Sequence, residues 1–261
     1  MRNQLWLAAV LSASLVAGAS AQDVPAASST TGSAAAYFAD ARRLTGAGQF
    51  DEAHAAFAKG IALDPSNATA VMRQAGAFMG LKRPDDALKV LDKWIEFKPE
   101  DPQRWLFRCM IAAQGGRVEE ALKAADKVTQ LQPDNADGWN GKGEMLVALN
   151  RNDEALKAFD KATTLNPKHE AAWSGRGDIL LRNGKYDDAI KSLDKAIALA
   201  PKWADPYFDR ACAYAETSDR TNALADLTQA IALQPSLKTN AQKNEHFRSL
   251  ANDPDFKKLM Q

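Results

Sequence analysis

Small and apolar residues recur along most of this chain with a period of 34 residues. Six prolines follow this interval: Pro65, Pro99, Pro133, Pro167, Pro201 and Pro235. An alanine lies twelve residues before each of them, and the residue four positions after that alanine is mostly apolar. A third column, 28 residues before each proline, reads Tyr37, Val71, Trp105, Trp139, Trp173 and Tyr207. Three columns in one register predict an array of six similar units.

The fourth unit, residues 136–169, shows which elements each unit should contain. Trp139, Gly143 and Leu146 share one face of a helix. Asp153 and Glu154 then open a second helix, where acidic residues suit the positive end of the helix dipole. The residue before Pro167 is steered away from helical geometry, so the second helix should end there. Each unit is therefore predicted to be a helical hairpin.

A column of small residues indicates where the two helices of a hairpin approach closely. It consists of Ala75, Cys109, Gly143, Gly177 and Ala211. A large side chain at such a position would overpack the contact and destabilise the fold by about 1–3 kcal/mol.

These columns resemble the tetratricopeptide repeat (TPR) pattern W-x2-L-G-x2-Y, A-x3-F and P. The fourth and fifth units match best, with Trp139, Gly143, Ala155 and Phe159 in the fourth. The resemblance implies an all-α, right-handed α-solenoid. The six repeats would be residues 34–67, 68–101, 102–135, 136–169, 170–203 and 204–237. Val71, Pro84 and Ser218 depart from the pattern, so the second and sixth repeats should be less regular.

The residues before the array have a different character. Arg2, an apolar run over residues 5–16 and Ala19-Ser20-Ala21 fit a secretory signal peptide at residues 1–21, cleaved after Ala21. An uncleaved membrane anchor is the alternative, but the apolar run is short for a membrane span. Residues 22–33 are small and polar, which predicts a flexible linker. We therefore expect a periplasmic or secreted protein with no stable membrane insertion after cleavage.

Residues 238–261 follow the array but do not match the repeat. Asp253 and Pro254 are a suitable cap and first residue for a short helix that carries Phe256 and Leu259. Because a solenoid must cover its last apolar face, we expect this tail to be a C-terminal cap. A mobile peptide that docks elsewhere is the alternative.

Charge and chemistry exclude several functions. The chain has 33 basic and 33 acidic residues, so it lacks the basic excess of a nucleic-acid or anionic-membrane binder. The segment beginning His169-Glu170 lacks the second histidine of a zinc motif, because Trp173 occupies that position. The G-x-G segments lie inside predicted helices and cannot cradle a phosphate. We expect no catalytic site, no metal and no cofactor.

Two cysteines lie three repeats apart. An internal disulfide between Cys109 and Cys212 is excluded if the repeats stack, since a disulfide needs Cα atoms within about 7 Å. Cys109, in the small-residue column, is predicted to be buried. Cys212 is one position further round its helix and is expected to face outward.

In the TPR family, the first helix of each repeat lines a concave groove that holds a partner peptide or helix. The resemblance therefore places contact residues opposite the packing stripe. In repeats one to three they are Phe38, Arg42, Met72, Arg73, Met79, Leu106, Phe107 and Met110. In repeats four to six they are Asp137, Asn140, Glu144, Asp178, Arg182, Asp205, Phe208, Asp209 and Glu216. The first set is apolar with two arginines, whereas the second is mostly acidic.

These features predict a non-enzymatic scaffold that binds a protein or peptide partner in the bacterial periplasm. Apolar residues of the partner would lie on repeats one to three, and its Lys or Arg residues on repeats four to six. One alternative is a self-associating module whose groove holds its own tail or a second copy. Another is an accessory subunit of an envelope enzyme or secretion machine.

Overall fold

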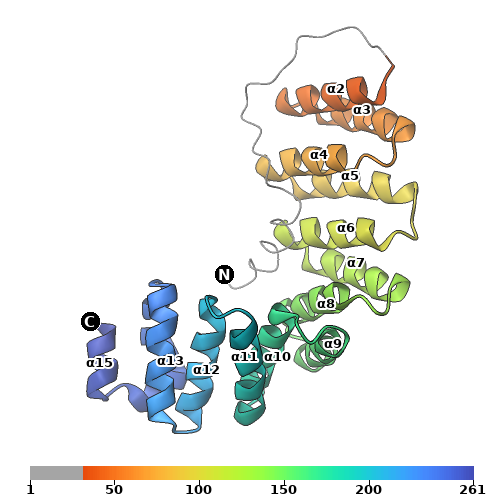
Figure 1. Cartoon of the computed structure of the whole chain (residues 1–261). Helices are drawn as coiled ribbons and strands as arrows, with labels where there is room; N and C mark the ends of the chain where they lie inside the picture. The colour runs from red at the N-terminus through yellow and green to blue at the C-terminus, as the bar shows by residue number, and fades with distance from the viewer. Residues whose placement is uncertain (1–31) are drawn as a thin grey trace. The chain divides into compact units, whose positions relative to one another are not determined.

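The computed structural model describes residues 32–261 and is helical throughout, with no strand in that range (Figure 1). The predicted all-α fold is confirmed. The predicted signal peptide and residues 22–31 of the predicted linker lie outside the described residues. None of the helices between residues 32 and 261 combines the length and apolar character that a membrane span requires.

Six helical hairpins follow one another, each with a first and a second helix. They are α2 (Ala34–Gly46) with α3 (Phe50–Leu63), α4 (Ala68–Gly80) with α5 (Pro84–Glu96), α6 (Pro102–Gln114) with α7 (Val118–Leu131), α8 (Ala136–Ala148) with α9 (Asn152–Leu165), α10 (Glu170–Arg182) with α11 (Tyr186–Leu199), and α12 (Ala204–Glu216) with α13 (Arg220–Leu233).

The chain divides into two compact units, which meet between Pro133 and Asp134. In the first unit, α2 packs against α4, and α5 packs against α6. In the second unit, α8, α10 and α12 pack in series, so that first helices of neighbouring repeats lie side by side. Each unit thus carries a surface made of its first helices and another made of its second helices.

The alanine column forms the contact between the helices of each hairpin. Its members are all fully buried: Ala53, Ala87, Ala121, Ala155, Ala189 and Ala223. Phe57, Leu91, Phe159, Leu193 and Leu227, four residues later in their helices, are at most 1% exposed. The two columns therefore fill the core that the 34-residue period predicts.

The small-residue column also behaves as expected. A Cβ atom on Gly143 would lie 2.7 Å from the Phe159 ring, and one on Gly177 would lie 2.6 Å from Leu193 Cγ. Gly175 was not part of that column, yet its Cβ would lie 2.5 Å from the same Phe159 ring. Phe159, on α9, is therefore seated between glycines of α8 and α10.

Ion pairs join neighbouring repeats in a regular pattern. Arg108 donates to Asp92 at 2.6 Å, and Arg176 donates to Asp160 at 2.7 Å. Arg210 makes the equivalent bond to Asp194, sixteen residues before it. Each arginine lies on a first helix and reaches back to the second helix of the preceding repeat, so the pairs fix the stacking of successive hairpins.

The turn inside each hairpin contains one residue with left-handed backbone geometry. Three of these positions are glycines, Gly48, Gly116 and Gly184, with φ between 71° and 78°. The equivalent positions in the other repeats are Lys82, Asn150 and Ser218, with φ of 57°, 58° and 61°. A residue with a Cβ atom is strained in this region, and asparagine tolerates it better than lysine or serine.

We expect Lys82→Gly and Ser218→Gly each to stabilise the protein by roughly 0.5–1.5 kcal/mol, because the left-handed strain is removed. Asn150→Gly should gain less. Urea unfolding followed by circular dichroism at 222 nm measures these differences. If Lys82→Gly lowers stability instead, the turn does not have the geometry described.

The C-terminal tail covers the end of the second unit. It forms α14 (Leu237–Lys243), the 3-10 helix η1 (Glu245–Leu250) and α15 (Pro254–Met260). The Asp253 side chain caps α15 by accepting the backbone N–H groups of residues 255 and 256, as predicted. Phe247 and Phe256 are buried with the core of α12 and α13. The tail is thus a cap in this structure.

Both cysteines are buried. The prediction for Cys109 is confirmed. The prediction that Cys212 faces outward is wrong, because its side chain is 1% exposed and belongs to the core that α12 shares with the cap.

Candidate functional site

Twelve of the predicted contact residues are at least partly exposed on first helices. In the first unit these are Arg42, Met72, Arg73, Met79, Leu106 and Phe107. In the second unit they are Asp137, Glu144, Asp178, Arg182, Asp205 and Glu216. We call each set the first-helix face of its unit.

The other five are buried, so the structure does not offer them to a ligand. They are Phe38, Met110, Asn140, Phe208 and Asp209, which are at most 5% exposed. Their prediction as contact residues is wrong. The physical reason is that a first helix packs against its own second helix as well as against neighbouring repeats, which leaves only a narrow exposed stripe.

Two aromatic residues illustrate this correction. The Phe38 ring packs against Phe57 at 5.6 Å between centroids and fills the space above Gly60, which lacks a Cβ atom. Phe208 lies edge-on to Phe247 of the cap, with centroids 5.6 Å apart. The cap also engages Glu216, whose carboxylate lies 2.7 Å from His246 Nδ1. The tail therefore already occupies part of the predicted surface on the sixth repeat.

The first helices of the two units differ in charge. Those of the first unit contain five arginines and one aspartate. Arg104 and Arg108 are used internally: Arg104 donates to the Pro65 carbonyl, and Arg108 bonds to second helices. Arg42 and Arg73 are exposed, and Met72 and Met79 are partly exposed. The first-helix face of the first unit is therefore cationic and apolar.

The first helices of the second unit contain seven acidic and four basic residues. Arg182 pairs with Asp178 at 2.9 Å on α10. Asp137 Oδ1 lies 3.2 Å from Nε2 of His169, the N-cap residue of α10, without ideal hydrogen-bond alignment. The adjacent imidazole lowers the pKa of Asp137. Much of the acidity predicted for this face is therefore already balanced within the unit.

Glu144 is the exception among these carboxyl groups. It accepts a hydrogen bond from Asn140 Nδ2 at 3.0 Å, and both residues lie on α8. Desolvation raises the pKa of Glu144 to about 8, against the smaller effect of the Asn140 bond, which lowers it. The side chain of Glu144 is thus largely neutral near pH 7.

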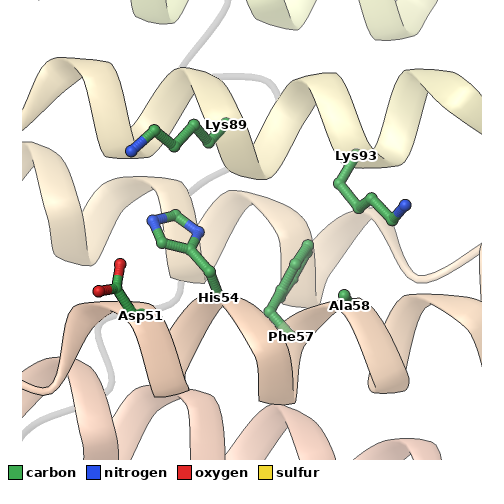
Figure 2. Close-up of a pocket in the computed structure, with 6 residues that line it drawn as sticks. All are labelled: Asp51, His54, Phe57, Ala58, Lys89 and Lys93. Atoms are coloured by element: carbon green, nitrogen blue, oxygen red, sulfur yellow. The ribbon is translucent and has the colours of Figure 1, made fainter.

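An open pocket lies elsewhere, between the second helices α3 and α5 of the first unit (Figure 2). Its volume is about 320 Å³. The lining residues are Asp51, His54, Phe57, Ala58, Lys89 and Lys93. None of them was predicted as a site residue, because the repeat pattern directs attention to first helices.

Asp86 organises one side of this pocket. It accepts bonds from His54 Nε2 at 3.1 Å, Lys89 Nζ at 3.1 Å and Arg83 Nε at 2.5 Å. Although burial opposes ionisation, these donors lower the pKa of Asp86 to about 2. The His54 ring also stacks on Phe78, at 4.8 Å. The bond from His54 of α3 therefore joins the first two repeats, whereas Arg83 and Lys89 belong to the same repeat as Asp86. The lining contains no hydroxyl or thiol nucleophile.

Residues 32–261 contain no group of three or more His, Cys, Asp or Glu side chains that could hold a metal ion. The arrangement of the described side chains is suited to hydrogen bonds, ion pairs and apolar contacts with another molecule.

Many solved structures resemble this one. MamA 41-end from Desulfovibrio magneticus RS-1 is 20% identical, with a TM-score of 0.57 over 66% of this chain and 97% of that one. The protein of "Functional Characterization of Pseudomonas Aeruginosa pilF" is 18% identical, with a TM-score of 0.60 over 83% and 96%. YrrB, described as a TPR protein with an unusual peptide-binding site, is 24% identical, with a TM-score of 0.55 over 71% and 97%. At these identities the likeness shows the fold.

No curated protein sequence matches this chain. Three family models do match, and each is described as a tetratricopeptide repeat. They cover residues 44–108, then 110–170 and 146–203 in two overlapping matches, and finally 204–237. Together they span most of the array that the 34-residue period defines. The chain therefore belongs to the tetratricopeptide repeat family.

Proposed function

We propose that this protein is a non-enzymatic scaffold that binds a segment of a partner protein on its first-helix faces. TPR proteins act in general as protein-interaction modules, which supports the class of function. The observation that carries the proposal is that the first helices of the first unit carry exposed side chains that the fold does not use. Arg42 and Arg73 are exposed and Met72 is partly exposed, whereas the side chains that hold the repeats together are bonded within the fold.

The chemistry of the faces restricts the partner segment. The face of the first unit suits apolar residues accompanied by a carboxylate, since methionine side chains adapt to varied apolar surfaces and the exposed charges are arginines. The face of the second unit suits a cationic residue. Binding through such exposed charges weakens as salt is added, because ions screen them.

We place the protein outside the cytoplasm, in the periplasm if the source is a bacterium. This part of the proposal rests on the sequence of residues 1–21. Osmotic-shock fractionation and N-terminal sequencing test it. A mature chain beginning at Gln22 in the periplasmic fraction is expected, and an intact chain in the cytosol would contradict it.

Charge reversal tests the binding face. The variant Arg42→Glu/Arg73→Glu should lose at least tenfold in affinity for the partner captured by the parent chain. Its control, Lys59→Glu/Lys123→Glu, makes the same change in charge at exposed positions of the second helices α3 and α7. An equal loss of affinity in both variants would indicate a nonspecific charge effect. A loss of affinity in the control alone would indicate that the partner binds to the second helices.

A further inference from the structure

The carboxyl group of Glu144 lacks a counter-ion. Its one hydrogen-bond partner in the described chain is the amide of Asn140, at 3.0 Å. The second carboxyl oxygen, Oε2, makes no ion pair or hydrogen bond there. Glu144 nevertheless retains some exposed surface on the first-helix face of the second unit, so another molecule can reach it.

The other accessible acids of this face differ from Glu144. Asp178 pairs with Arg182, and Asp137 lies beside His169. Glu216 contacts His246 of the cap, and the Trp203 indole donates to Asp205 at 3.4 Å. Asp178, Asp137 and Glu216 thus each lie beside an arginine or a histidine of their own unit. Glu144, like Asp205, has only a neutral N–H donor, and Glu144 is the one whose donor is itself fully buried.

Asn140 supplies a second, independent observation. It is fully buried, and its Oδ1 atom is enclosed without any hydrogen-bond partner. A buried amide oxygen without a partner costs about 1–3 kcal/mol. The fold accepts this loss of stability at Asn140, the residue that positions the Glu144 carboxyl group. An unsatisfied buried polar atom beside an accessible carboxyl group is typical of a ligand site rather than of a surface that only stabilises the fold.

The charged groups on the neighbouring helices of the second unit do not neutralise Glu144. On α9, Glu154 pairs with Arg151 and Asp160 pairs with Arg176 of α10. On α10, Arg182 is held by Asp178. Lys157 and Lys161 of α9 are exposed on the second-helix side of their hairpin. On α8 itself, Lys142 Nζ lies over the Trp139 ring, 5.4 Å from its centroid. Within residues 32–261, no ion pair joins a cation to the Glu144 carboxyl group.

We infer that Glu144, positioned by Asn140, is a subsite for a primary ammonium or guanidinium group, supplied by a lysine or arginine side chain of the bound partner. This inference rests on the proposed function and gives the chemistry of one contact within it. An incoming cation would convert the protonated carboxyl group to a carboxylate, with its proton released to solvent, because a nearby positive charge favours the ionised form.

A small probe tests the subsite without the partner. We choose n-butylammonium, which has the stem and charge of a lysine side chain, and N-butylacetamide, its neutral counterpart. The ionisation of Glu144 in the full-length chain can be followed by the carbon-13 shift of its carboxyl group. Saturating n-butylammonium should lower the measured pKa of Glu144 from about 8 to about 7 or below. N-butylacetamide should leave it unchanged.

Two variants complete the test. Glu144→Gln keeps the shape and the Asn140 contact, and it should abolish the response of the Asn140 side-chain amide to n-butylammonium. Asp178→Asn removes a carboxylate that is already paired, and it should retain the response. The inference is overturned if n-butylammonium leaves the Glu144 titration unchanged, or if the Asn140 response survives in Glu144→Gln.

The subsite and the proposed scaffold function can be tested independently of each other. A partner that binds normally to Glu144→Gln but not to Arg42→Glu/Arg73→Glu would uphold the scaffold and overturn the subsite. A probe response without any captured partner would uphold the subsite and count against the scaffold.

Discussion

Replacing Glu144 with glutamine is expected to make the protein more stable, and increasingly so as the pH rises from 5 to 8. Desolvation raises the pKa of Glu144 to about 8 in the folded chain, above the 4.5 of an unperturbed glutamate. Between these values the folded chain holds a proton that the unfolded chain has lost. The stabilisation that this bound proton gives is fully present below the pKa of Glu144 in the unfolded chain. It is lost as the pH rises through the pKa of Glu144 in the folded chain.

The free energy of unfolding should therefore fall by up to roughly 1.4 kcal/mol per pH unit across this interval, and level off above it. Glu144→Gln carries no such titration, so the difference between variant and parent should reach at least about 2 kcal/mol at pH 8. Denaturant unfolding at several pH values measures it.

Glu154 provides the control because it is an exposed glutamate bonded to Arg151, which lowers its pKa. Glu154→Gln should show no stabilisation at high pH. If Glu144→Gln and the parent instead keep a constant difference from pH 5 to 9, the carboxyl group is not desolvated and the subsite loses its physical basis.

Gly175→Ala is the second change expected to have a large effect. A Cβ atom there would lie 2.5 Å from Cζ of Phe159, whose ring is also 2.7 Å from the corresponding position on Gly143. The ring is 1% exposed and rigid, so it cannot move aside cheaply. We expect Gly175→Ala and Gly143→Ala each to destabilise the protein by about 1–3 kcal/mol.

Gly76→Ala is the matched control. Gly76 lies inside α4, and a Cβ atom would meet nothing within 4 Å. Alanine should therefore stabilise α4 by roughly 0.5–1 kcal/mol, because it restricts the unfolded chain and favours the helix. Urea unfolding distinguishes the two cases by the sign of the change. Stabilisation by Gly175→Ala would show that Phe159 does not occupy the space between α8 and α10.

The fold could be predicted from the sequence because the same types of packing residue recur in every repeat. Ala155 and Phe159 alone do not show whether they are buried, but similar residues at intervals of 34 positions identify them as a contact between helices. Gly175 was missed because it lies outside the column shared by all repeats. Its role depends on the size of Phe159 in the preceding repeat, which a column of single residues does not reveal.

The contact residues were harder to predict, because helical spacing gives a direction but not the width of the exposed stripe. Helical spacing predicts that Met110 and Asp209 face away from the packing column, yet they are only 2% and 4% exposed. Phe208 could not be recognised as buried until the position of the cap was known. The sixteen-residue spacing of Arg176 from Asp160 and of Arg210 from Asp194 was available in the sequence, and would have identified these arginines as structural.

Site-specific photo-crosslinking in the source cells tests most directly whether a partner lies on the first helices. A photoreactive amino acid would replace Arg73 or Arg182 on first-helix faces, or Lys59 or Lys195 on second helices, all four of which are exposed. A crosslinked partner is expected from Arg73 and Arg182, and none from Lys59 and Lys195. Crosslinks confined to the second-helix positions would contradict this expectation.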